Sequence, residues 1–148
     1  MIASFLHNYI FIKTKKTAST TVEMTLAPSC GPEDIITPLP RPEEMTRGNG
    51  ERLCRNFLSD RALEEEFRDA MRRSDRKGHS RVKKMLRMSG MYFNHMIAAD
   101  IKSKLAPDFW NGALKITVER HPYERVVSRA YFRFNNDRRR SSTRRAKS

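Results

Sequence analysis

The chain has 148 residues and a formal net charge of +13, values that fit one basic domain with a modest hydrophobic core. No apolar run approaches the roughly 20 residues of a membrane-spanning helix, and no charged start with a long apolar stretch marks a secretory signal, so we expect a cytoplasmic protein. Cys30 and Cys54 lack CxxC spacing, and no His, Cys and carboxylate set has zinc-site spacing, so we expect free thiols and no metal.

The segment Tyr9–Glu23 joins a predicted strand to a predicted helix. Residues 10–12 form an apolar β-branched run, and apolar residues at helical spacing follow it: Val22, Met24 and Leu26. Lysines and hydroxyl residues fill the space between: Lys13, Lys15, Lys16, Thr17, Ser19, Thr20 and Thr21. A helix start offers free N–H groups to a phosphate or sulfate, although the Walker pattern is absent here. Two interpretations stay open, an anion-binding loop and a solvated lysine turn after an edge strand.

The next segments predict a loop and a helix. Five prolines indicate a long loop over Pro28–Gly50. Ser59 or Asp60 can cap a helix that ends at Asp75–Ser80. The apolar face of that helix is made of Leu63, Phe67, Ala70 and Met71. An i,i+4 ion pair is expected between Glu64 and Arg68.

Three more elements follow along the chain. Helical spacing predicts a helix around Met96–Leu105, and an apolar run predicts a short buried strand at Leu114–Val118. Pro122 then begins a last helix with an apolar side made of Val126, Val127, Ala130, Tyr131 and Phe134. This order of elements indicates an α/β fold.

The second strand-to-helix junction, Lys115–Phe132, also carries groups that suit an anion. Arg120 lies just beyond the predicted strand, and Ser128 lies two turns into the helix. A guanidinium can hold a phosphate with two hydrogen bonds, and a serine hydroxyl can join it. The alternative is that Arg125 and Arg129 are surface residues and that Ser128 simply packs.

Together the two junctions resemble the sulfotransferase family that uses 3′-phosphoadenosine 5′-phosphosulfate, most closely its carbohydrate-sulfotransferase branch and small bacterial members. The family's first motif, close to PKTAGTS, is matched by Lys15–Thr21, and its second, close to R-[ND]-P-x-[ED]-R-x-x-S, by Arg120–Ser128. Cys30–Pro38 and Phe93–Met96 echo the bacterial members. The resemblance covers most of Asn8–Phe134. It implies a P-loop-like three-layer core in which helices flank a short parallel sheet.

The resemblance also implies an activity, the transfer of a sulfuryl group from the nucleotide donor to an acceptor hydroxyl of a carbohydrate or similar small molecule. Lys16 would neutralise the charge that develops on the leaving group, and His95 would remove the acceptor proton. The implied donor-binding residues are Lys15, Lys16, Thr17, Ala18, Ser19, Thr20, Thr21, Arg120 and Ser128. The residues alone leave another role open for His95, as a cap of the helix around Met96–Leu105. The loop Pro28–Gly50 and the polar middle segment of the chain are expected to line the acceptor site.

Three further expectations concern the match. Ser19 stands at the position of the motif's glycine, where a Cβ disfavours a positive φ, and His121 replaces the usual Asn or Asp. The family pattern ends near Phe134, so we expect a domain over residues 1–136, incomplete at its C-terminal side, and a disordered basic tail over 137–148. Six positively charged side chains lie in that tail, at Arg138, Arg139, Arg140, Arg144, Arg145 and Lys147. Two alternatives follow, a basic protein that binds nucleic acid or another polyanion, and an inactive sulfotransferase remnant.

Overall fold

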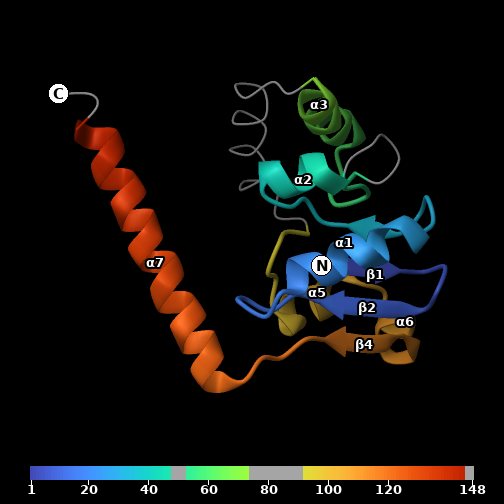
Figure 1. Cartoon of the computed structure of the whole chain (residues 1–148). Coiled ribbons are helices and arrows are strands. Elements are labelled where there is room, and N and C mark those ends of the chain that lie inside the picture. The colour runs from blue at the N-terminus through green and yellow to red at the C-terminus, as the bar shows by residue number, and fades with distance from the viewer. Residues whose placement is uncertain (48–52, 74–91, 146–148) are drawn as a thin grey trace.

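The computed structural model describes residues 1–47, 53–73 and 92–145, and it shows an α/β fold around a mixed four-stranded sheet (Figure 1). The sheet order is β3 (Ile35–Ile36), β1 (Ile2–Ser4), β2 (Tyr9–Ile12) and β4 (Leu114–Thr117). Strand β1 is antiparallel to both of its neighbours, and β2 and β4 are parallel. The expected all-parallel sheet is therefore wrong, because the four-residue turn between β1 and β2 is too short for a parallel crossover.

The helices confirm most of the sequence pattern. They are α1 (Ser19–Leu26), the 3₁₀ turn η1 (Ala27–Ser29), α2 (Arg41–Arg47), α3 (Arg61–Arg72), α5 (Ala98–Lys104), α6 (Pro107–Gly112) and α7 (Pro122–Arg145). The helices expected after the first strand, after Asp60, near residue 100 and from Pro122 are all present. The break expected at Asp75–Ser80 lies outside the described residues.

The segment Pro28–Gly50 is wrong as a continuous loop, because it contains η1, β3 and α2; its residues 48–50 lie outside the described part of the chain. Pro42 is the second residue of α2, a position whose N–H has no partner within a helix. Pro42 is therefore compatible with a helix that begins at Arg41, although prolines in this segment predicted a loop.

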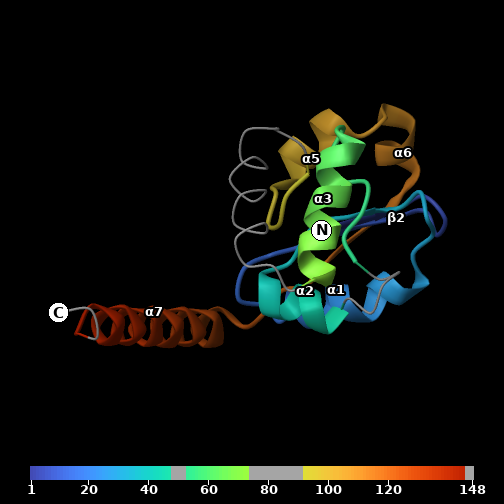
Figure 2. The same cartoon turned by 90° about the horizontal axis from the view of Figure 1, so that it is seen from above.

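Helices cover both faces of the sheet. On one face Ile2, Tyr9, Phe11 and Ile36 are buried with Ala27, and Val22 and Leu26 of α1 pack on them. On the other face Ala3, Ile10 and Ile35 join a larger core with Phe67 of α3 and Ile101 of α5. Figure 2 shows α1 on one side of the strands and α5 and α6 on the other. Successive residues of β1 and β2 thus face opposite cores, as the two-residue period of a strand requires.

Helix α3 begins as predicted, but its expected ion pair is wrong. The Asp60 carboxylate accepts a hydrogen bond from the Leu63 N–H at 3.0 Å and caps the helix. Glu64 is buried and accepts hydrogen bonds from the N–H groups of residues 56–58, so it does not pair with Arg68. Arg68 instead lies 3.2 Å from Glu65.

Strand β4 and helix α7 are more exposed to solvent than the sequence predicts. Strand β4 is at the sheet edge, with Leu114 65% exposed, so the expected buried strand is wrong. Helix α7 extends away from the body (Figure 1), and its apolar side chains are exposed: Tyr123, Val126, Val127, Tyr131 and Phe134. Within the described parts of the chain, no helix is both long enough and apolar enough to span a bilayer.

Helix α7 also corrects the expected tail. It continues without a break to Arg145, so residues 137–145 are helical where a disordered segment was expected. Arginine has a high helix propensity, and extending an existing helix avoids the unfavourable nucleation step. The expected boundary at residue 136 therefore falls inside a helix.

Candidate functional site

The parallel pairing of β2 with β4 brings the two motif segments together. Ile12 pairs with Thr117, so the carboxyl ends of both strands reach the same edge of the sheet. Just beyond that edge, the Thr14 hydroxyl donates a 2.6 Å hydrogen bond to the Val118 carbonyl. The loop before α1 and the loop before α7 therefore begin side by side.

These segments line a cavity of about 640 Å³. Its lining residues are Lys15, Lys16, Ala18, Ser19, Thr20, Glu43, His95, Arg120, Ser128, Arg129, Phe132 and Arg133. Most of the site residues expected from the sequence are among them. Two are not, since Thr17 is buried with its hydroxyl 2.8 Å from that of Thr14, and Thr21 is exposed outside the lining.

The loop before α1 achieves its turn without glycine. Lys16 has a φ of 65° and Ala18 a φ of 58°, so the left-handed backbone falls on these residues and not on Ser19. Ser19 begins α1 and donates a 2.6 Å hydrogen bond to the Thr14 carbonyl. The conflict expected between a positive φ and the Cβ of Ser19 is therefore wrong.

The N-terminus of α1 is open toward the cavity. Its N-cap, Ala18, supplies no capping side chain, and no group in the described ranges accepts a hydrogen bond from the N–H of Ser19 or Thr20. Both residues line the cavity. A helix start with free N–H groups and a positive dipole end favours an anion at this place.

The lysines of the first motif have different roles. Lys13 is buried, and its Nζ lies 3.0 Å from Glu23 Oε2, so its charge is used inside the fold. Burial lowers the pKa of Lys13, and Glu23 partly offsets that effect. Lys15 and Lys16 line the cavity, and Lys16 Nζ sits 3.6 Å from the centre of the Phe132 ring. This cation–π contact links the first loop to α7.

His95 lies at the cavity in a defined orientation. Its Nδ1 is 3.4 Å from the Lys13 carbonyl oxygen, which can only accept a hydrogen bond, so Nδ1 carries the proton and Nε2 is free to accept one. Burial and the nearby positive charge of Lys13 lower the pKa of His95 below 6.5. The capping alternative is wrong, because Ile97 is the N-cap of α5 and no side chain caps that helix.

Sequence reasoning missed four lining residues. Glu43 arrives from α2, and its Oε2 is buried without a hydrogen-bond partner among the described residues. No local pattern could have placed it, because the helix that carries it was expected to be a loop. Arg129, Phe132 and Arg133 share the lined side of α7 with Ser128, and their helical spacing was the available signal.

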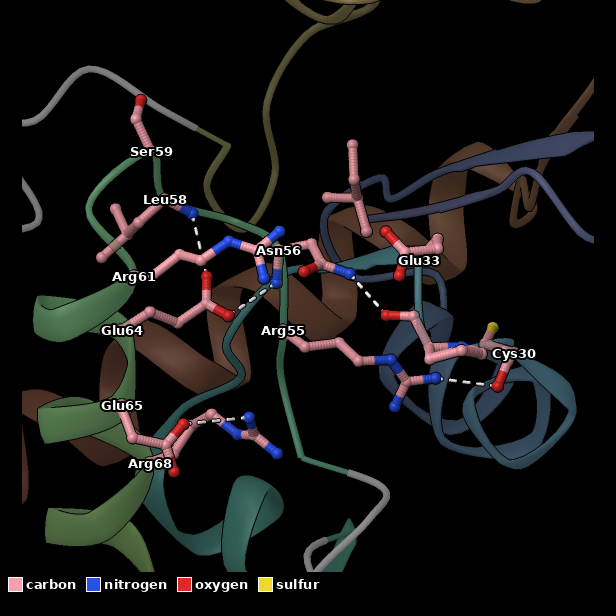
Figure 3. A pocket seen from close by; sticks show the side chains of 12 residues that line it. Cys30, Glu33, Arg55, Asn56, Leu58, Ser59, Arg61, Glu64, Glu65 and Arg68 are labelled. Carbon is pink, nitrogen blue, oxygen red and sulfur yellow. Dashed lines mark hydrogen bonds and ion pairs between the residues drawn. The ribbon is translucent and has the colours of Figure 1, made fainter.

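A second, larger hollow of about 880 Å³ lies between α3 and the segment around Cys30 (Figure 3). The polar side chains seen there hold loops together. Arg55 donates to the Cys30 carbonyl, Asn56 to the Pro32 carbonyl, and Glu64 accepts from the Leu58 N–H. These groups are committed to the fold, so we assign the functional site to the smaller cavity.

Comparison with protein-family models, curated proteins and solved structures finds no match to this chain. In the described ranges, no group of three or more His, Cys, Asp or Glu side chains is arranged to hold a metal ion. The cavity and its residues are therefore the basis on which a function can be inferred.

Proposed function

We propose that this chain is a sulfotransferase that uses 3′-phosphoadenosine 5′-phosphosulfate and modifies an acceptor hydroxyl of a carbohydrate or similar molecule. One observation carries the proposal: two segments far apart in the sequence, within residues 15–20 and 120–133, contribute side chains to one cavity, which His95 also lines. The unit formed by β2, its loop and α1, with β4 parallel to β2, supports a P-loop-like core.

The chemistry of the lining suits a nucleotide that bears several anionic groups. Five basic side chains line the cavity: Lys15, Lys16, Arg120, Arg129 and Arg133. One carboxylate, that of Glu43, opposes them. The open N-terminus of α1 would hold the 5′-phosphosulfate, and Arg120 with Ser128 would hold the 3′-phosphate. The bound nucleotide would supply the activated sulfuryl group.

The residues divide the transfer between a base and a cation. His95 Nε2 would take the proton from the acceptor hydroxyl as the new S–O bond forms. Lys16 would stabilise the negative charge on the phosphate oxygen as the S–O bond to it breaks. The products are a sulfate ester and adenosine 3′,5′-bisphosphate, and the proton remains on His95 until solvent removes it. Placing the groups in line supplies much of the catalysis.

The deciding experiment is calorimetric titration of the chain with adenosine 3′,5′-bisphosphate. We expect saturable binding that Lys16→Ala weakens by about tenfold or more, because a charge-assisted hydrogen bond is lost. Lys102→Ala is the matched control, since Lys102 is an exposed lysine on α5 outside the cavity. Absence of binding by the unmodified chain at millimolar nucleotide would overturn the proposal.

A basic protein that binds nucleic acid or another polyanion is a second candidate. The observation in its favour is that α7 extends from the body and carries the arginine-rich segment to Arg145. This candidate predicts sequence-independent binding to a single-stranded oligonucleotide that weakens steeply with salt. Binding that persists unchanged after residues 138–148 are removed would argue against it.

A further inference from the structure

We propose that Arg129 and Arg133 of α7 form a two-arginine clamp for a phosphate group of the bound nucleotide. This inference rests on the proposed function and extends it, because the sulfotransferase resemblance gives these two residues no role. Both side chains line the cavity. Residues four apart lie one helical turn from each other on the same face, so the two guanidinium groups can approach one anion together.

The contact of Phe132 with Lys16 determines which side of α7 faces the cavity. The Phe132 ring lies against the Lys16 ammonium at 3.6 Å. Arg129 and Arg133 precede and follow this ring on the helix, and both belong to the lining. The exposed apolar residues Tyr123 and Phe134 lie outside it. The two arginines therefore lie on the side of α7 that faces the loop before α1.

The state of the neighbouring arginines strengthens the inference. Arg120 Nε lies 2.9 Å from Glu124 Oε2, and Arg125 Nη1 lies 3.2 Å from Glu119 Oε2. In contrast, Arg129 and Arg133 have no carboxylate within ion-pair distance in the part of the chain that the structure describes. Arg120 would exchange one anionic partner for another on binding phosphate, whereas Arg129 and Arg133 give up no ion pair among the described side chains.

The test is calorimetric titration of single variants with adenosine 3′,5′-bisphosphate. We expect Arg129→Ala and Arg133→Ala each to weaken binding about tenfold or more, because charge-assisted hydrogen bonds to phosphate are lost. Arg125→Ala is the matched control: Arg125 is on the same helix with its charge paired to Glu119, outside the cavity, and its variant should stay within about twofold. Titration of the arginine variants with adenosine 5′-monophosphate and adenosine 3′-monophosphate identifies the clamped phosphate. The mononucleotide that carries this phosphate should bind the variants more weakly than the unmodified chain.

The outcomes separate this inference from the function on which it rests. If the unmodified chain binds and Lys16→Ala weakens binding, but both arginine variants stay within about twofold, the clamp is overturned and the proposed function stands. An equal loss in Arg125→Ala would show general attraction by the helix charge and would also overturn the clamp. If the unmodified chain does not bind, both proposals fail. Circular dichroism of each variant checks that α7 remains helical.

Discussion

The carboxylate of Asp34 organises the turn that joins β1 to β2. It accepts hydrogen bonds from the Ser4 hydroxyl at 2.6 Å and from the N–H groups of Phe5, Leu6 and Gly31 at 2.7, 3.1 and 2.8 Å. Burial opposes the ionised form, but the hydrogen bonds from Ser4 and the backbone outweigh burial and lower the pKa of Asp34 below 3.8.

Replacement of this carboxylate should reduce stability in a pH-dependent way. A lowered pKa in the folded state means that Asp34 contributes stability above the unfolded pKa, and that this contribution disappears as the pH falls through the folded value. We expect Asp34→Asn to lower the free energy of unfolding by about 1–3 kcal/mol at pH 7. In urea titrations the gap to the unmodified chain should close below about pH 3.8. Glu33→Gln, an exposed neighbour, is the control.

The lowered pKa of His95 gives the proposed transfer reaction a pH dependence. Burial and Lys13 lower its pKa below 6.5, so the imidazole is neutral at pH 7 and becomes protonated only in acid. Transfer should therefore be independent of pH near neutrality and fall at acidic pH, with a midpoint below 6.5. The kcat/KM profile with labelled donor measures this. Transfer that survives in His95→Ala would exclude the histidine as the base.

Glu43 places a negative charge among the basic residues of the cavity. Because that charge repels an anionic nucleotide, we expect Glu43→Gln to tighten binding of adenosine 3′,5′-bisphosphate several-fold, by roughly 1 kcal/mol. Calorimetry measures the change, with Glu33→Gln as the control outside the cavity. Weaker binding in the variant would mean instead that the carboxylate holds a basic side chain in position.

At the scale of elements, two adjacent glutamates on α3 have contrasting roles. Glu64 is buried and accepts hydrogen bonds from three backbone N–H groups at 2.7–3.1 Å, which fix the segment before the helix. Glu65 is exposed and pairs with Arg68 and Arg72. A buried acceptor that serves several donors contributes far more to stability than an exposed ion pair.

The contrast provides a matched test. Glu64→Ala should lower the free energy of unfolding by about 2–4 kcal/mol, because three buried N–H groups lose their partner. Glu65→Ala should change it by less than about 1 kcal/mol. Urea titration of both variants measures the difference. Equal effects would show that the segment 56–58 is held by other contacts.

The elements that the sequence predicts best are those with a long periodic pattern. Helix α3, with twelve residues, is predicted with its cap. Strand β2 is short, but its apolar residues are consecutive and also indicate a strand. Strands β1 and β3 have three and two residues, too few for any alternation to be visible. The prolines of residues 28–50 favoured a loop where α2 forms. Strand β4 was expected to be buried because an apolar run alone does not indicate which element will cover it.

For the whole molecule, the sequence predicts the residue types of the cavity better than their geometry. The two motifs indicated that Lys16, Arg120 and Ser128 would meet, and the parallel pairing of β2 with β4 explains how. The side chain of Thr17 is buried away from the cavity because its hydroxyl hydrogen-bonds to that of Thr14, a contact that the sequence does not reveal. Glu43 depends on tertiary packing that no local pattern encodes.

The basic segment at the end of α7 should not contribute to nucleotide affinity. Removal of residues 138–148 takes away six positive charges and none of the cavity residues. We expect the dissociation constant for adenosine 3′,5′-bisphosphate to stay within about threefold, because distant charges are screened at physiological salt. Calorimetry of the shortened chain tests this. A large loss would assign the attraction to the segment and favour the polyanion candidate.

The pairing of β2 with β4 also has a consequence for synthesis of the protein on the ribosome. Strand β1 and the loop before α1 leave the ribosome early, whereas β4 and the cavity face of α7 leave late. Until β4 arrives, the edge of β2 that it covers has unpaired backbone groups, which are prone to pair with other chains. Nascent chains of intermediate length should therefore aggregate readily and lack nucleotide affinity, and both properties should change once residue 133 has emerged.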